Sequence, residues 1–320
     1  MIHSLTAGYN KIIIAPLNWG LGHATRCIPL INTLLKAGKE VILASDGEAL
    51  ELLQEEFPQL NTEVLPAYNV LYKSDKVFQL VLSNAPKIFS AIRRERKVAD
   101  QLYNKHKPDL IISDSRFGFR SDKVKSVIIS HQLQLVSSNA FVGHWMNLVN
   151  TRLLNKFDGC WIPDDEQHSL SGELSQNPKI KSQSYLGTLS RLSPDVSSQK
   201  IYDVTMILSG PEPARTNLEE NLIKDFNTST NNFCLVRGTT RLAPLALPTN
   251  WTVIDRANST QINRLLLSSH RIISRSGYTS LMDYKALGIS AELIPTKGQS
   301  EQEYLAEYVN GREGFSIYRG

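Results

Sequence analysis

The stretch KIIIAPLNWGLGHATRCIPLINTLLKAGKEVILAS, residues 11–45, decides the fold class. Residues 11–17 are a short apolar run that is typical of a buried strand. From Ala24 onward apolar side chains recur at helical spacing, and Gly38 marks the end of that helix. A second apolar run at 40–45 predicts the next strand. The order strand, Gly-rich turn, helix, strand is the repeating unit of a parallel α/β sheet.

The same alternation continues along the chain in two series. The first series adds a helix at 48–57 and strands at 109–114 and 126–130. The second series begins near Tyr202, and its expected strands are 203–210, 233–238, 251–255, 270–277 and 290–295. Repeated β–α units with short connections predict parallel sheets covered by helices on both faces. We therefore expect an α/β fold of two doubly wound, Rossmann-like halves that bind ligands at the carboxyl ends of their strands.

The expected domain boundaries follow from a change in composition between the two series. The chain has 320 residues, more than one core usually holds. Residues 161–185 are polar, contain Pro and Gly, and lack a periodic apolar pattern. We expect an N-terminal domain at 1–163, a linker region at 164–200 and a C-terminal domain at 201–320, with a ligand cleft shared by the two domains.

Net charge, cysteine content and apolar runs indicate which partners and which compartment the protein has. The net charge of +4 and pI of about 8.8 favour anionic ligands or a membrane surface, but are too low to indicate nucleic acid. The three cysteines are far apart and match neither a disulfide framework nor a zinc site, which indicates a reducing compartment. The sequence contains no apolar run that could span a bilayer and no apolar signal core near its start. These features predict a cytoplasmic protein.

Residues 86–107 are expected to form a helix in which Ile88, Ile92, Val98 and Leu102 alternate with clustered Arg and Lys. The favoured interpretation is a solvated charged face. The alternative is contact with anionic lipid, which would place the protein peripherally on the inner face of a membrane.

The segment 274–308 carries the most specific motif. Ser276 and Gly277 end a strand and open a helix, whose N-terminal N–H groups and dipole suit a phosphate. Asp283 on that helix can present a carboxylate to sugar hydroxyls. A strand then ends at Pro295, and a polar loop follows that carries Gln299, Glu301 and Gln302.

In this order the motif resembles the donor region of GT-B glycosyltransferases, in particular the family-28, MurG-like group. The resemblance implies a GT-B fold and a UDP-sugar that is a co-substrate, with no separate cofactor. It also implies that the Ser276–Gly277 turn contacts the diphosphate or sugar, that Asp283 holds the ribose, and that Gln299, Glu301 and Gln302 contact the transferred sugar.

Two further segments fit the same resemblance. LSGPEPAR, residues 208–215, stands where the family has a diphosphate loop, so Ser209 and Gly210 are expected donor contacts. Pro211 and Pro213 replace glycines there and remove N–H donors, for which Arg215 could compensate as a phosphate ligand; the alternative is a solvated surface arginine. Arg191, in GTLSR, is a second candidate phosphate contact, with a linker arginine as the alternative.

The turn NWGLGHATR resembles the Gly-His turn after the first strand of GT-B acceptor domains. The resemblance implies that Gly20, Gly22 and Arg26 bind the acceptor and that His23 is the general base, a role that suits imidazole near neutral pH. Asp114, at the end of a strand, is the expected orienting acid. The alternatives are a capping or phosphate-contacting role for His23, a turn role for Asp114 and a surface role for Arg26.

Together these residues predict an inverting, metal-independent transferase that moves a hexose or N-acetylhexosamine from a UDP-sugar to a hydroxyl acceptor. The acceptor would be a glycolipid, cell-envelope or polysaccharide precursor, and could be lipid-linked. The sequence contains no Asp-x-Asp pair for a divalent ion, and NWGLGHATR lacks the spacing of a dinucleotide-binding turn. A UDP-sugar 2-epimerase and a non-catalytic nucleotide-sugar-binding protein are the alternative functions. Residues 60–105 and 130–160 carry no assignable motif. The long final helix of many GT-B proteins would be short, absent, or missing because the sequence is a fragment.

Overall fold

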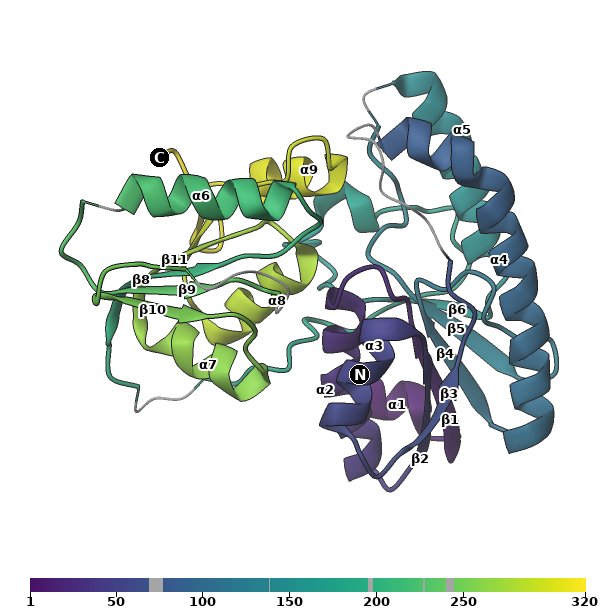
Figure 1. Cartoon of the computed structure of the whole chain (residues 1–320). Helices are drawn as coiled ribbons and strands as arrows, with labels where there is room; N and C mark the ends of the chain where they lie inside the picture. Colours follow the sequence, from purple (N-terminus) through teal and green to yellow (C-terminus); the bar gives the residue numbers. More distant parts are fainter. Residues whose placement is uncertain (69–76, 138, 195–197, 227, 240–244) are drawn as a thin grey trace. The chain divides into compact units, whose positions relative to one another are not determined.

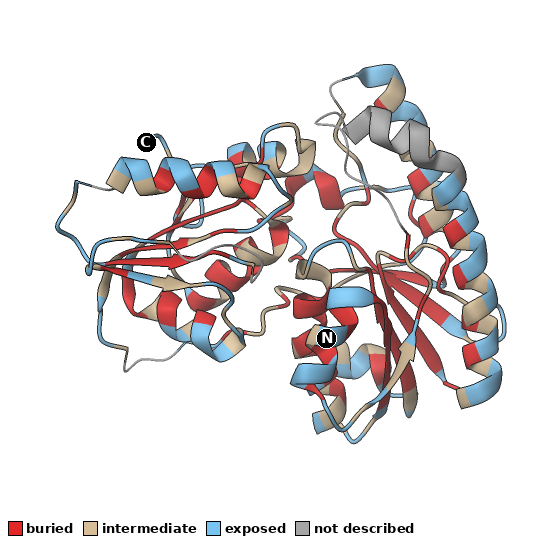
Figure 2. Cartoon of the chain, in the orientation of Figure 1, coloured by how far each residue is buried: buried red, intermediate tan, exposed pale blue. Residues whose placement is uncertain are grey.

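The computed structural model describes residues 1–68, 77–137, 139–194, 198–226, 228–239 and 245–320, with the backbone alone for 77–86. These residues form two compact units, Met1–Ser190 and Arg191–Gly320 (Figure 1). Each unit contains one parallel sheet with helices against it. The central strands of both sheets are buried, and they are red in Figure 2.

The N-terminal unit contains a seven-stranded sheet in the order β3-β2-β1-β4-β5-β6-β7, with every neighbouring pair parallel. Its strands are β1 (Lys11–Pro16), β2 (Glu40–Ser45), β3 (Asn61–Val64), β4 (Leu110–Asp114), β5 (Lys125–Ile129), β6 (Gly159–Ile162) and β7 (Gln183–Tyr185). Its helices are α1 (Ile2–Thr6), α2 (Gly22–Lys36), α3 (Gly47–Glu56), α4 (Val77–His106), α5 (Ala140–Leu154) and the 3-10 helix η1 (Gly172–Ser175). The strand order reverses between β1 and β4, which is where open α/β sheets bind ligands.

The C-terminal unit repeats this plan with a six-stranded parallel sheet in the order β10-β9-β8-β11-β12-β13. Its strands are β8 (Tyr202–Ile207), β9 (Phe233–Val236), β10 (Trp251–Ile254), β11 (Ser269–Ser274), β12 (Ala291–Leu293) and β13 (Phe315–Ile317). Its helices are α6 (Ala214–Phe226), α7 (Ser259–Leu267), α8 (Tyr278–Leu287) and α9 (Ser300–Val309). Here the order reverses between β8 and β11.

Apolar burial explains why these segments take these places. Ile13, Ile42 and Ile111 of β1, β2 and β4 are fully buried in one cluster, to which Val98 and Leu102 of α4 add their side chains. Of the apolar positions expected at 86–107, Val98 and Leu102 therefore face the sheet, as in an amphipathic surface helix, while Ile88 packs against Leu17, Tyr68 and Ala91. No described helix is both long and apolar enough to cross a membrane.

The structure confirms the expected strands to within two or three residues, and it differs from the expected domain boundaries. Residues 164–190, expected as part of a linker, contain η1 and β7 and belong to the N-terminal unit. Leu170, Leu174 and Ile180 are buried there, but they are spaced irregularly, so no helical or strand period appears in the sequence. The boundary between the units lies at Ser190–Arg191.

Candidate active site

One candidate site lies in the N-terminal unit, at the carboxyl ends of β1 and β4. Pro16, the last residue of β1, pairs in register with Asp114, the last residue of β4. After β1 the chain turns through Gly20, whose φ of +78° is a left-handed conformation that favours glycine. Helix α2 then begins at Gly22, and His23 is its second residue. Gly20 and Gly22 thus shape the turn that brings His23 to the reversal point, while their expected contact with the acceptor stays a prediction.

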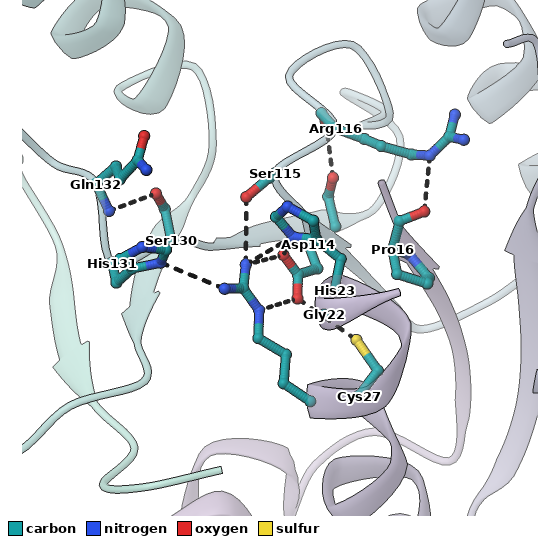
Figure 3. A network of polar contacts seen from close by, with 12 residues as sticks. Pro16, Gly22, His23, Cys27, Asp114, Ser115, Arg116, Ser130, His131 and Gln132 are labelled. Carbon is teal, nitrogen blue, oxygen red and sulfur yellow. Dashed lines mark hydrogen bonds and ion pairs between the residues drawn. The ribbon is translucent and has the colours of Figure 1, made fainter. Parts of the chain in front are cut away.

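His23 and Asp114 form a hydrogen-bonded pair (Figure 3). The Nδ1 atom of His23 lies 2.8 Å from Oδ1 of Asp114. The Asp114 side chain is fully buried, while 19% of the His23 side chain is exposed. This is the geometry that a general base with an orienting carboxylate requires: one ring nitrogen is held and the ring keeps access to solvent.

Arg26 lies three residues after His23 on α2 and also binds Asp114. Its Nε donates to Oδ2 of Asp114 at 2.5 Å, and its Nη2 donates to Oδ1 of the same carboxylate. Nη2 also lies 3.3 Å from Oγ of Ser115, and the Arg26 side chain is only 2% exposed. Arg26 was expected to contact an anionic acceptor, and the structure corrects this expectation. Its guanidinium is buried and donates to both oxygens of the Asp114 carboxylate.

The proton on His23 is assigned by counting donors. Nδ1 of His23 lies near both the Asp114 carboxylate and Nη2 of Arg26, at 2.8 and 2.9 Å. Arginine only donates, and the two N–H groups of Nη2 are satisfied by Asp114 and Ser115. Nδ1–H therefore donates to Asp114. In the neutral ring this leaves the lone pair on Nε2, the nitrogen that can accept a substrate proton.

The charge state of Asp114 follows from its neighbours. Burial by itself raises the pKa of Asp114, but Arg26 and His23 outweigh burial and hold that pKa well below its ordinary value of 3.8. Asp114 is therefore an anion throughout the neutral range. Cys27 lies 3.6 Å from Oδ2 of Asp114, and burial followed by the charge of Asp114 raises the pKa of its thiol well above the ordinary value. The thiol is neutral and is not a nucleophile candidate.

Two residues of this network were absent from the sequence prediction. Ser115, with φ of +59°, follows β4 directly, and His131 follows β5. Nδ1 of His131 lies 3.3 Å from Nη1 of Arg26; since arginine only donates, this nitrogen is the acceptor and the neutral ring carries its proton on Nε2. The available signal was position: His131 stands just past a predicted strand, as Asp114 ends one, and parallel strands end at one edge.

A second buried network supports this edge. Arg116 is fully buried; it donates to the carbonyl oxygen of Pro16 at 2.9 Å and to Glu95 at 2.7 Å, and it pairs with Asp46. Glu95 also accepts from the Tyr68 hydroxyl at 2.6 Å. Since these residues come from β1, α4 and the loops after β2, β3 and β4, the network ties the turn before α2 to the sheet and to α4.

The other candidate site lies in the C-terminal unit, at the carboxyl ends of β8 and β11. Ser276 and Gly277 follow β11, and α8 begins directly after Gly277 without a side-chain cap on its N-terminus. Such an N-terminus can bind an anion through its backbone N–H groups. Ser209 and Gly210 follow β8 and are exposed, and Gly210 has φ of +104°. The expected diphosphate turn and loop therefore come from the two strands that flank the reversal point.

The polar loop before α9 is joined to the Ser276 turn. Oγ of Ser276 donates to the carbonyl oxygen of Gln302 at 2.8 Å. Oε1 of Gln302 accepts from the backbone N and the hydroxyl of Thr296, both at 2.9 Å, and its Nε2 donates to Gln299 at 2.7 Å. The structure thus brings together Ser276, Gln299 and Gln302. Glu301 is half-buried beside them on α9, and Asp283 is 8% exposed on α8; their sugar and ribose contacts stay predictions.

Arg215 has a different place from the one expected. Its guanidinium is 2% exposed and lies 2.5 Å from Glu212, 3.0 Å from Glu219 and 3.3 Å from the carbonyl oxygen of Arg237. Glu219 is in turn held by two nitrogens of Arg237, both at 2.9 Å. This geometry is that of a structural ion-pair network and argues against a phosphate ligand. Arg191 is half-buried at the first position of the C-terminal unit, and its expected phosphate contact stays a prediction.

Arg275 was missed by the sequence analysis although it precedes Ser276. It is 5% exposed and donates to the carbonyl oxygens of Pro295 and Ala214, at 3.2 and 2.8 Å. Its Nε has no hydrogen-bond partner among the described residues, and burial lowers the pKa of its guanidinium. Within the described residues, no group of three or more His, Cys, Asp or Glu is arranged to hold a metal ion.

Comparisons with known proteins agree on the type of protein. A family model described as "Glycosyl transferase family 1" matches residues 11–319. The comparison with curated proteins gives no match. Among solved structures, the glycotransferase of kitacinnamycin has a TM-score of 0.66 at 14% identity, over 97% of this chain and 86% of that one.

Two other similar structures contain nucleotides. UGT2 of Phytolacca americana, complexed with UDP-2fluoro-glucose and pterostilbene, has a TM-score of 0.65 at 14% identity, over 98% of this chain and 86% of that one. The spinosyn rhamnosyltransferase SpnG, complexed with thymidine diphosphate, has a TM-score of 0.63 at 14% identity, over 96% and 86%. At these identities the likeness establishes the fold, the two parallel α/β sheets of GT-B proteins.

Proposed function

Since the chain belongs to glycosyl transferase family 1 and is a glycosyltransferase, we propose that it transfers a hexose or N-acetylhexosamine from a UDP-sugar to a hydroxyl acceptor. The observation that carries this proposal is the His23–Asp114 pair, 2.8 Å apart at the reversal point of the N-terminal sheet. A partly exposed imidazole on a buried carboxylate is suited to take a proton from a hydroxyl.

In the proposed mechanism Nε2 of His23 takes the proton of the acceptor hydroxyl. The acceptor oxygen then attacks the anomeric carbon, the bond from that carbon to the diphosphate oxygen breaks, and UDP leaves with the bonding electrons. In-line attack gives inversion. Asp114 stabilises the imidazolium that forms. The N-terminus of α8 stabilises the charge on the leaving diphosphate, so that the reaction proceeds without a metal ion.

The donor assignment rests on the loops at the second reversal point. Ser209 and Gly210 follow β8, and Ser276 and Gly277 follow β11, so these turns can reach one diphosphate at the end of the sheet. The nucleotides in the UGT2 and SpnG structures, UDP-2fluoro-glucose and thymidine diphosphate, support a nucleoside diphosphate donor. The order Ser276, Asp283, Gln302 supports the finer proposal of a family-28, MurG-like donor site with UDP.

A lipid-linked acceptor at a membrane is the second part of the proposal, and the exposed face of α4 supports it. Among residues 87–97 the one carboxylate, Glu95, is buried on Arg116. The exposed face carries Lys87, Phe89, Arg93, Arg94 and Lys97 and therefore has the positive charge and apolar side chain of an interfacial helix.

Vesicle sedimentation tests the membrane contact. The variant changes Arg93, Arg94 and Lys97 to Glu and spares Arg96, which donates to the carbonyl oxygen of Arg120. A control with the same change in charge replaces the exposed Lys36, Lys179 and Lys181 by Glu. We expect wild type and control to bind anionic vesicles and the α4 variant to lose binding, whereas equal binding by all three refutes the contact.

The transferase proposal is tested by binding and turnover together. UDP is titrated by calorimetry, and a panel of UDP-sugars with acceptor extracts is scored for UDP release. We expect His23→Ala to bind UDP and lose turnover, and Asp283→Ala to weaken UDP binding. The controls His3→Ala and Glu307→Ala change exposed residues of the same two units and should resemble the wild type. Turnover by His23→Ala would refute His23 as the general base. UDP binding without turnover of any donor would support a non-catalytic binding protein. Release of a 2-epimeric sugar would support the epimerase.

A further inference from the structure

Arg26 contacts several members of the acceptor-side network, whose residues His23, Asp114 and His131 are labelled in Figure 3. It donates to both oxygens of Asp114, lies 3.3 Å from His131 and 3.3 Å from Ser115, and is buried. Nε and Nη2 are held by Asp114, Nη2 also lies 2.9 Å from Nδ1 of His23, and the side chain is only 2% exposed, so the guanidinium is not presented to an acceptor. It therefore acts on the reaction chiefly through Asp114 and His23.

We propose that Arg26 is a positioning residue that balances the charge of Asp114 and thereby controls how readily His23 takes up a proton. The proposal deepens the proposed function and rests on His23 being the base. It assigns to Arg26 a role in the protonation of the catalytic pair in place of acceptor binding.

The charge count gives the direction of the effect. With Arg26 present, the buried Asp114–Arg26 pair is neutral, so a proton on His23 creates a net positive charge. Without Arg26, His23 would face an uncompensated buried carboxylate, and its protonated form would gain an ion pair. A protonated ring cannot accept the proton of a hydroxyl. Arg26 therefore shifts His23 toward the unprotonated ring that a base requires.

The geometry adds an orientation effect. Because Arg26 bonds both carboxylate oxygens, Asp114 cannot rotate about its χ2 without losing one of these bonds. Oδ1 is thus fixed 2.8 Å from Nδ1 of His23. This holds the Nδ1–H tautomer, and Nε2 keeps its lone pair for the substrate.

The other groups around His23 and Asp114 do not neutralise the charge of the Asp114 carboxylate. The side chains in contact with the Asp114 carboxylate are His23, Arg26 and the neutral thiol of Cys27. His131, from the loop after β5, meets Arg26 as a neutral acceptor. The next charges along the edge, Arg116, Asp46 and Glu95, pair with one another. Among the described residues in contact with Asp114, Arg26 is thus the one permanent cation.

The test reads His23 directly and needs no substrate. Long-range ¹H–¹⁵N NMR of the full chain follows the imidazole nitrogens against pH, and His23→Gln identifies the His23 signals among the seven histidines. We expect the Nδ1–H tautomer in the wild type. In Arg26→Met the pH at which His23 gains its proton should rise by about one unit or more. Arg26→Lys, which keeps the charge, should restore most of the wild-type midpoint.

Two further variants keep the test decisive. Arg26→Gln, which retains an N–H donor but no charge, should show the same rise if the methionine variant does not fold. In the Asp114→Asn background, Arg26→Met should cause a smaller rise, because the carboxylate is gone and only the direct contact of Arg26 with Nδ1 of His23, at 2.9 Å, remains. An unchanged or lower midpoint in Arg26→Met and Arg26→Gln overturns the proposal.

Activity then separates this proposal from the proposed function. Turnover is measured against pH with the donor found in the UDP-sugar panel. In Arg26→Met, the acid limb of this profile should move to higher pH by as much as the His23 midpoint rises in the NMR titration. If the protonation midpoint of His23 rises by NMR but the acid limb of the pH–turnover profile does not move, the role of Arg26 is supported and His23 is refuted as the base. A higher KM for the acceptor with no NMR rise overturns the proposal and supports acceptor binding by Arg26.

Discussion

Asp114 lies directly opposite Pro16 in the parallel pairing of β4 with β1. This register sets the geometry of the His23–Asp114 pair, because the turn after Pro16 leads within seven residues to His23, whose ring then meets the Asp114 carboxylate. Two side chains that are 91 residues apart in the sequence are thus brought to 2.8 Å by the pairing of two strands. A shift in the register of β4 would separate them.

The buried pair of Asp114 and Arg26 should make stability depend on pH in a defined direction. The pKa of Asp114 is held below its ordinary value of 3.8 in the folded protein, so its stabilising effect is complete above that pH and is lost as the pH falls. Asp114→Asn leaves Arg26 as a buried, unpaired charge, which costs about 3–5 kcal/mol of unfolding free energy at pH 7. Urea unfolding between pH 7 and 3 should show a difference in unfolding free energy between the wild type and Asp114→Asn. This difference should be constant down to about pH 4 and become smaller below it.

Glu51→Gln is the control for this measurement, because Glu51 is an exposed carboxylate on α3 of the same unit. Its free energy of unfolding should stay within about 0.5 kcal/mol of the wild type at every pH. A gap for Asp114→Asn that widens as the pH falls would contradict the assigned charge state of Asp114.

Gly118 should not tolerate a side chain, since it lies against α4. A Cβ there would come within 2.3 Å of the carbonyl oxygen of Ile92 and 2.8 Å of Cβ of Glu95. Because Glu95 holds Arg116, a displaced α4 would also disturb the buried network at the site. We expect Gly118→Ala to lower the unfolding free energy by about 1–3 kcal/mol, measured by urea unfolding.

The matched control is Gly8→Ala, where an added Cβ meets nothing within 4 Å. It should leave stability unchanged or slightly higher. If both alanine variants have the same stability, Gly118 does not mark a close contact between α4 and the sheet edge.

The strands and the position of His23 could be predicted from the sequence because both depend on local patterns. Apolar runs mark the strands, Gly38 ends α2 with φ of +71°, and a residue after a parallel strand must lie at the carboxyl edge. The pairing of His23 with Asp114 needed only the further assumption that β1 and β4 share a sheet, which the structure confirms.

The partners of the arginines could not be predicted, because a one-dimensional pattern does not show which charges are buried together. Arg26 and Arg215 both looked like exposed ligand contacts, and both are paired with carboxylates in the interior. The carboxylate partner of Arg26 is Asp114, 88 residues away. For Arg215 the signal was present but unused, since Glu219 lies four residues later on the same helix.

Gln302 is the residue of the second reversal point whose role can be separated by choice of ligand. If it contacts the transferred sugar, Gln302→Ala should weaken binding of the active UDP-sugar by about three- to tenfold and leave UDP binding unchanged. Thr296→Val is the matched control, because it removes one hydrogen bond to Oε1 of Gln302 and keeps the amide in place. Calorimetry with both ligands tests this: an equal loss for UDP and UDP-sugar would mean that Gln302 orders the loop without touching the sugar.

Arg215 offers a direct comparison of the sequence-based and structural interpretations. Arg215→Met breaks its pairs with Glu212 and Glu219, while Glu219 keeps Arg237. We expect a loss of about 2–3 kcal/mol of unfolding free energy, somewhat less than for a carboxylate left entirely unpaired. UDP affinity, measured well below the unfolding transition, should stay within about twofold of the wild type. Arg319→Met, at an exposed position of the same unit, should change neither quantity. A stable Arg215→Met variant with greatly weakened UDP binding would restore the phosphate role that the sequence suggested.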